Sequence, residues 1–220
     1  MKHKIHMFIK FGSLENIQDL YENGTVYLNT IQHFRDYEDQ QLRGDAYEGA
    51  SKVKNSLPGT FRIPGIDRDF LYEKIHLKEA YKKVIGNIYS LYCISSSGTP
   101  YNPQDFVVDS RVQEFGSHCL LVKNNFYFFE KIKEVLKANN YISHDGFVNY
   151  YDKEKYTGDV SLFDKPQEFA FQREFRFYVE NSSIKPIVVQ IGSLKQYAEI
   201  METSEIIKRQ EEFLSNGLKK

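Results

Sequence analysis

The segment FAFQREFRFYV, residues 169–179, alternates aromatic and polar side chains and predicts a β-strand. Side chains alternate sides along a strand, so the phenylalanines share one face, interrupted only by Arg173. The other face carries Gln172, Glu174 and Arg176 in consecutive positions. The many phenylalanines favour a central strand with both faces covered, where a carboxylate needs partners or a purpose. The alternative is a solvent-exposed face on which glutamate and arginine pair across strands.

The rest of the chain predicts more strands than helices. Apolar residues at helical spacing predict helices over 12–24, 126–140 and 201–217. Runs rich in β-branched and aromatic residues predict strands over 4–11, 25–29, 87–97, 113–124, 146–151 and 186–192, with weaker ones around 52–57, 60–63 and 70–77. Because strands and helices do not alternate regularly, the predicted class is α+β, with a mostly antiparallel central sheet and helices packed outside. No repeat, low-complexity tract or linker divides the chain, so residues 1–220 are expected to form a single domain.

Composition bounds the function classes. The 29 basic and 30 acidic residues give a net charge of -1, which excludes a global basic field for nucleic acid but not a local groove. Cys93 and Cys119 each lie in an apolar, strand-like stretch and are expected to be buried, reduced thiols. No apolar run approaches about 18 residues, so neither a membrane span nor a membrane partner is predicted. These features predict a soluble cytoplasmic protein.

Two groups of polar side chains lie on the predicted strands. The run Ser95 to Ser97 ends the strand NIYSLYCI, where hydroxyls could align the sugar or amide of a ligand; the alternative is a plain turn. His6 and Lys10 are expected on one side of the first strand. Lys10 could meet a phosphate there, and the alternative is ordinary polarity of an edge strand.

The loop RGDAYEG breaks the periodicity and concentrates Arg43, Asp45 and Glu48. It could bind a ribose or a divalent cation, or be a solvated loop with local ion pairs. A metal-dependent nuclease using Asp45, Glu48 and Glu174 is a further alternative, but the chain lacks a lysine two residues from an acid on the same strand. The loop does not have the ligand spacing of an EF-hand, and paired cysteine ligands are absent, so no metal site is predicted.

A basic or histidine residue on the first strand, a serine run on a middle strand and a QxE element on a late strand resemble the signature of cholera-toxin-like ADP-ribosyltransferases. The resemblance implies NAD as substrate, Glu174 as the catalytic carboxylate, Gln172 as the acceptor-side residue and Ser95 as the pocket serine. The arginine of the family's first strand is absent here, so Lys10 or His6 would replace it. An ADP-ribosyltransferase-like architecture is implied as well.

A second resemblance covers roughly residues 5 to 180. The series LYENGTVYLNT, GDAYEG, YSLYCISS, FGSHCLLV and KPQEFAFQREFRF is similar to a large uncharacterised bacterial family often found beside phage-defence genes. Its most recognisable element is an aromatic residue followed by an EFR-type strand, matched here by Phe171, Glu174, Phe175 and Arg176. This resemblance implies a defence context and no established reaction.

Two functions follow as expectations. The first is a toxin-like or defence-associated effector that cleaves the nicotinamide–ribose bond of NAD, by hydrolysis or by transfer to a protein or nucleic-acid acceptor. Its catalytic residues would be Glu174 and Gln172, and its NAD-binding residues Lys10, His6, Ser95, Ser96, Arg43 and Arg176. The second is a non-catalytic module of a phage or phage-defence system that binds a nucleotide or a protein. In that case Glu174 would serve to hold Arg176.

Overall fold

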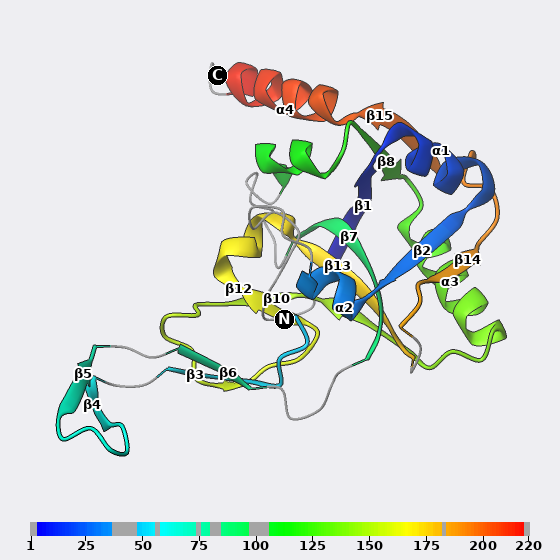
Figure 1. Cartoon of the computed structure of the whole chain (residues 1–220). Helices are drawn as coiled ribbons and strands as arrows, with labels where there is room; N and C mark the ends of the chain where they lie inside the picture. The colour runs from blue at the N-terminus through cyan, green and yellow to red at the C-terminus, as the bar shows by residue number, and fades with distance from the viewer. Residues whose placement is uncertain are drawn as a thin grey trace.

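A large antiparallel sheet confirms the predicted α+β class. The computed structural model describes residues 4–36, 48–55, 58–73, 76–79, 85–96, 106–181 and 184–217. The sheet has the strand order β14-β2-β7-β1-β8-β15, and β13 and β9 join it beside β7 (Figure 1). The strands are β1 (Lys4–Gly12), β2 (Thr25–Thr30), β7 (Gly86–Ser96), β8 (His118–Val122), β9 (Ser143–Phe147), β13 (Glu174–Glu180), β14 (Ile187–Gln190) and β15 (Ala198–Glu202).

Among the described residues, the α-helices that accompany the sheet are α1 (Leu14–Asn23), α2 (Ile31–Asp36), α3 (Asn125–Ala138) and α4 (Thr203–Gly217). Local signals fix α1, because the Ser13 side chain accepts a hydrogen bond from the Asn16 N–H and Gly24 ends the helix with a φ of 69°. Asn124 caps α3 in the same way. Thr203, the first residue of α4, donates its hydroxyl to the Gly116 carbonyl.

Both faces of the sheet are covered. On one face α1 and α3 pack on Phe8, Leu91, Phe175 and Phe177, which we call the first core. On the other face Ile9, Tyr92, Val112 and Ile207 form the second core, under α4 and the 3₁₀ helix η2 (Ser110–Phe115). Strands β7 and β13 are therefore buried along most of their length, and their polar side chains need partners within the protein.

The first strand forms as predicted, but its alternation is broken. Ile5, Met7 and Ile9 are expected on one side, yet Ile5 packs against the first core while Met7 and Ile9 belong to the second. A register shift between Ile5 and Met7, in the pairing of β1 with β7, is the cause. Such a bulge reverses the side on which the preceding residues lie.

The prediction of one strand over residues 169–179 is wrong in its first half. Residues Gln167–Gln172 form a 3₁₀ helix, η3, and β13 begins only at Glu174. Between them Arg173 has a φ of 42°, and its carbonyl accepts a hydrogen bond from the Cys93 N–H (2.9 Å). The sequence pattern could not separate the two conformations, because the helix buries the same residues, Phe169 and Phe171, that a strand would bury.

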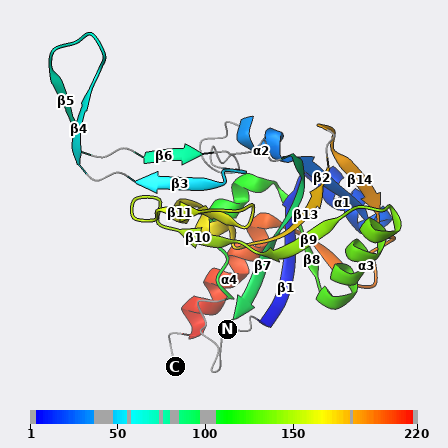
Figure 2. The ribbon, with the colours of Figure 1, turned by 90° about the horizontal axis from the view of Figure 1, so that it is seen from below.

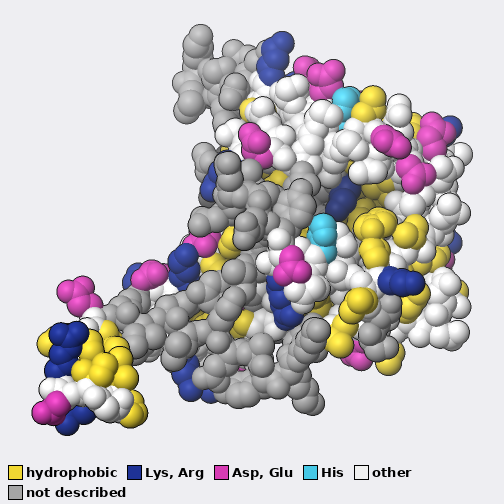
Figure 3. All heavy atoms as spheres, in the orientation of Figure 1, with side chains coloured by type: hydrophobic (Ala, Val, Ile, Leu, Met, Phe, Trp, Pro, Cys, Tyr) yellow, Lys and Arg dark blue, Asp and Glu magenta, His cyan; other side chains and the backbone are white. Residues whose placement is uncertain are grey.

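Smaller elements lie outside the main sheet. They are the three-stranded sheet of β11 (Gly158–Asp159), β3 (Lys52–Asn55) and β6 (His76–Glu79), the parallel pair β10 (Asn149–Tyr151) and β12 (Asp164–Pro166), and the hairpin of β4 (Gly59–Arg62) and β5 (Asp69–Tyr72). The hairpin projects away from the sheet as an arm (Figures 1 and 2). Apolar and charged side chains gather on it (Figure 3), with Leu71 85% exposed. Among the helices described, none is long and apolar enough to cross a lipid bilayer.

Candidate functional site

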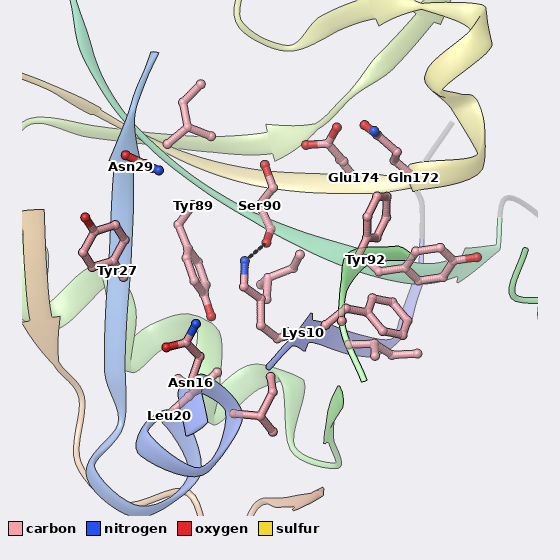
Figure 4. Close-up of a pocket in the computed structure, with 18 of the residues that line it drawn as sticks. Lys10, Asn16, Leu20, Tyr27, Asn29, Tyr89, Ser90, Tyr92, Gln172 and Glu174 are labelled. Carbon is pink, nitrogen blue, oxygen red and sulfur yellow. Dashed lines mark hydrogen bonds between the residues drawn. The ribbon is translucent and has the colours of Figure 1, made fainter. Parts of the chain in front are cut away.

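Along one edge of β7 the main sheet has a gap between two neighbouring strands, β1 and β2. β13 pairs along the other edge, so β1 and β2 must share this one. β2 pairs with the first residues of β7 and β1 with its last, so residues 89–91 have no strand partner on this edge within the described chain. Across the gap the Lys10 ammonium donates to the Ser90 carbonyl (2.8 Å), as Figure 4 shows. The Lys10 side chain thus connects β1 to β7 at residues where the two backbones are no longer paired.

A cleft of about 770 Å³ opens at this gap. Side chains from both faces of β7 line it, as expected of an opening at the edge of a strand. The polar and aromatic lining includes Lys10, Phe11, Asn16, Asp19, Tyr27, Asn29, His33, Phe34, Tyr89, Tyr92, Phe115, Lys165, Gln172, Glu174 and Arg176. The volume and the mixture of aromatic and polar groups are those of a small-molecule site.

One end of the cleft is a buried ionic network around Arg176. Its guanidinium donates through Nη1 and Nη2 to the two oxygens of Glu48 (2.8 and 2.9 Å) and through Nε to Oε2 of Glu174 (2.9 Å). Nη1 also donates to the Leu162 carbonyl (2.5 Å). Lys165 Nζ donates to Oε1 of Glu174 (2.8 Å) and to Oε1 of Gln172 (2.6 Å). This end of the cleft is therefore held by charge-assisted hydrogen bonds.

The network is electrically balanced and buried. Two carboxylates face two cations, and none of the four charged side chains is more than 8% exposed. Burial alone would raise the pKa of Glu174, but the charges of Arg176 and Lys165 outweigh it and hold that pKa far below its ordinary value. Burial alone would lower the pKa of Arg176, but Glu174 and Glu48 outweigh it and raise that pKa. Glu174 and Arg176 are therefore expected to be charged at neutral pH.

The backbone around Glu174 is also fixed. Its N–H donates to the Tyr150 hydroxyl (2.9 Å), and its carbonyl accepts from the Val148 N–H (3.0 Å). The Lys165 ammonium lies 4.7 Å from the centroid of the Phe169 ring, in η3. The 3₁₀ helix η3 thus covers the charged face of β13. Lys165 connects Glu174 to Gln172, because its ammonium donates to both side chains.

The middle and the other end of the cleft are built by β1, α1, β2 and β7. The Lys10 ammonium lies 4.4 Å from the centroid of the Tyr89 ring. Figure 4 shows Tyr89 pointing from β7 toward α1, which carries Asn16, while Tyr27 and Asn29 extend from β2. This end combines aromatic rings with side-chain amides, and Asp19 is its carboxylate.

The structure brings some predicted site residues together and separates others. Lys10, Gln172, Glu174 and Arg176 line the same cleft.

His6, Ser95 and Ser96 do not line the cleft. His6 Nε2 is 2.7 Å from the Ser96 hydroxyl, its ring lies against Phe106, and Ser95 lies next to Ser96 on β7, beyond Tyr92. Ser95, Ser96 and His6 therefore lie apart from the cleft that holds Lys10 and Glu174, and their assignment as NAD-binding residues stays a prediction. Arg43, like Asp45, lies outside the described residues.

Sequence reasoning missed three contributors. Lys165 precedes a proline in a short segment without periodicity, and its role depends on the fold of η3. Glu48 was assigned to a solvated or ligand-binding loop, whereas it is 4% exposed and pairs with Arg176. Tyr89 reads as an ordinary core residue of a buried strand. An arginine on a covered strand does require a buried acid, which was the available signal for Glu48.

No group of three or more His, Cys, Asp or Glu side chains within the described ranges could hold a metal ion. Searches against protein-family models, curated proteins and solved structures found no match. The resemblances to the ADP-ribosyltransferases and to the uncharacterised bacterial family therefore stay predictions.

Proposed function

We propose that this protein binds a nucleotide in the cleft at the edge of β7, with NAD as the nucleotide that the sequence favours. The observation that carries the proposal is the lining of the cleft, where aromatic rings and side-chain amides stand at one end, Lys10 in the wall and the Arg176 network at the other. Nucleotides present the matching groups, namely a planar base, hydroxyls and phosphates.

Each group of the cleft supports one part of such a ligand. Tyr27 is 51% exposed and Phe34 half-buried at the cleft, so their rings are accessible for stacking on a base. Asn16 and Asn29 carry both donors and acceptors, which suit the edge of a base. The Lys10 ammonium supplies positive charge for phosphate.

Calorimetry with NAD, ADP and GDP tests the proposal directly. We expect the Lys10→Met variant to bind NAD about 10- to 150-fold more weakly, because a charge-assisted hydrogen bond to phosphate contributes about 1.5–3 kcal/mol. The matched control is Lys123→Met, since Lys123 is an exposed lysine paired with Glu199 outside the cleft. Equal NAD affinities of both variants and the wild type would remove Lys10 from the site, and no heat with any nucleotide would end the proposal.

Cleavage of the nicotinamide–ribose bond is the second candidate. In that reaction the glycosidic C–N bond breaks with its electron pair on nicotinamide, and water or an acceptor nucleophile bonds to the ribose carbon. A fixed carboxylate such as Glu174, with Gln172 beside it, would stabilise the positive charge that develops on the sugar. Both Glu174 oxygens already accept hydrogen bonds from cations, which offsets this effect and favours binding as the first candidate.

Nicotinamide release separates the two candidates. If the second is correct, wild-type protein releases nicotinamide from NAD and the Glu174→Gln variant falls to the background rate, with folding of the variant checked by circular dichroism. NAD binding without release by the wild type would leave the binding function alone.

A further inference from the structure

The hydroxyl of Tyr89 is polar, buried and unpartnered. Tyr89 is 3% exposed, and within the described chain its hydroxyl is the buried side-chain group that lacks a hydrogen-bond partner. Native proteins pair nearly all buried polar groups, because a desolvated hydroxyl without a partner destabilises the folded state. A tyrosine in place of phenylalanine at this position therefore calls for an explanation outside the packing of the core.

The position of Tyr89 supplies that explanation. Its ring lines the cleft and packs with Ile17 and Leu20 of α1 in the first core. Its side chain points from β7 toward the helix that carries Asn16 (Figure 4). Burial raises the pKa of Tyr89, so the phenol stays protonated and can donate. A hydrogen-bond donor thus stands at the inner wall of the cleft beside apolar side chains.

The surroundings select the chemistry of the group that the hydroxyl can meet. A phosphate at this end would lie beside Ile17 and Leu20 and share the space with the Asp19 carboxylate, which is unfavourable for an anion. The cation next to this end of the cleft is Lys10, whose ammonium lies over the Tyr89 ring. An uncharged planar ring with an acceptor on its edge fits, because its faces are apolar and its edge can accept from the hydroxyl.

We propose that Tyr89 is the residue that recognises the heterocyclic ring of the bound nucleotide, by donating its hydroxyl to an acceptor on the edge of that ring. This inference rests on the proposed function and adds the part of the ligand that enters at the α1 end of the cleft. Lys10 then takes the phosphates. In NAD both the adenine and the nicotinamide carboxamide carry such an acceptor, so the two rings share the chemistry and must be distinguished by experiment.

The Tyr89→Phe variant tests the inference, because it removes one oxygen atom and keeps the ring. We expect its affinity for NAD, and for whichever of adenosine and nicotinamide binds the wild type, to fall about tenfold, the effect of one buried hydrogen bond. Affinity for inorganic pyrophosphate should stay within about twofold of wild type. The melting temperature of the free variant should equal or exceed that of wild type, since an unpartnered hydroxyl is lost.

The matched control is Tyr178→Phe on β13, outside the cleft lining. The Tyr178 hydroxyl donates to the Ile85 carbonyl (3.3 Å), so this variant should bind NAD as the wild type does and should not melt at a higher temperature. Unchanged NAD affinity in Tyr89→Phe, or a lower melting temperature of its free form, overturns the inference about Tyr89. The proposed function still holds in that case if the wild type binds NAD. No binding of NAD, adenosine or nicotinamide to the wild type overturns both.

Discussion

Replacing Arg176 with methionine is expected to lower the free energy of unfolding by about 3–5 kcal/mol, the range measured when one partner of a buried ion pair is removed. The guanidinium bonds to both oxygens of Glu48 and to Glu174, and all three side chains are buried. Methionine fills the space of the arginine stem, but it leaves the Glu48 carboxylate without its guanidinium partner and the Glu174 carboxylate with Lys165. Urea unfolding at neutral pH measures the change.

The control for this prediction is Arg209→Met. Arg209 pairs with Glu205 one turn earlier in α4, and the two side chains are 63% and 40% exposed. Exposed pairs of this kind contribute about 0.3–0.5 kcal/mol, so the control should lose far less stability. A loss in Arg176→Met as small as in Arg209→Met would show that Glu48 and Glu174 do not depend on the guanidinium.

The hydrogen bonds of Arg176 hold one wall of the cleft in place as well as stabilising the fold. Arg176 ties Glu48, which follows the undescribed residues 37–47, to the central strand β13 and to the carbonyl of Leu162. These connections fix one wall of the cleft from three distant parts of the chain. Partial loss of the network in a folded variant should therefore reduce nucleotide affinity together with stability.

Local signals in the sequence were sufficient for much of the fold. The strand β1 and the helices α1 and α3 follow from patterns within a few residues and were predicted correctly as elements. The conformation of residues 167–173 was not, because it depends on contacts between Arg173 and β7, far away in sequence. β15 was missed because its pairing with β8, and not a strong periodicity, defines it.

The candidate site divides in the same way. Glu174 and Arg176 were expected on the face of β13 opposite Phe175, and they lie there, buried. Their partners Glu48 and Lys165 come from a loop and a short strand whose positions only the fold determines. The expected grouping of His6 with Lys10 failed because the bulge in β1 breaks the alternation between them.

Acidification is expected to weaken the folded protein through Glu174. The pKa of this carboxyl is held far below 4.5 in the folded state, while in the unfolded chain it returns to about that value. Below pH of about 4.5 the unfolded state therefore binds one more proton than the folded state, and stability falls as the pH falls. The slope for one proton is about 1.4 kcal/mol per pH unit, with the full contribution present above about pH 5.5.

The Glu174→Gln variant isolates this contribution from that of other carboxylates. It is expected to be less stable than wild type at pH 7, because Arg176 and Lys165 lose their shared carboxylate. The difference in urea-unfolding free energy should then narrow by about 1.4 kcal/mol for each pH unit below about 4.5, since the variant cannot take up this proton. In the control Glu205→Gln, which changes an exposed pair, the unfolding free energy should change with pH nearly as it does in wild type. A constant difference between wild type and Glu174→Gln from pH 7 to pH 3 would mean that the pKa of Glu174 is the same in the folded and unfolded states, and the stabilisation of its carboxylate by Arg176 and Lys165 would have to be rejected.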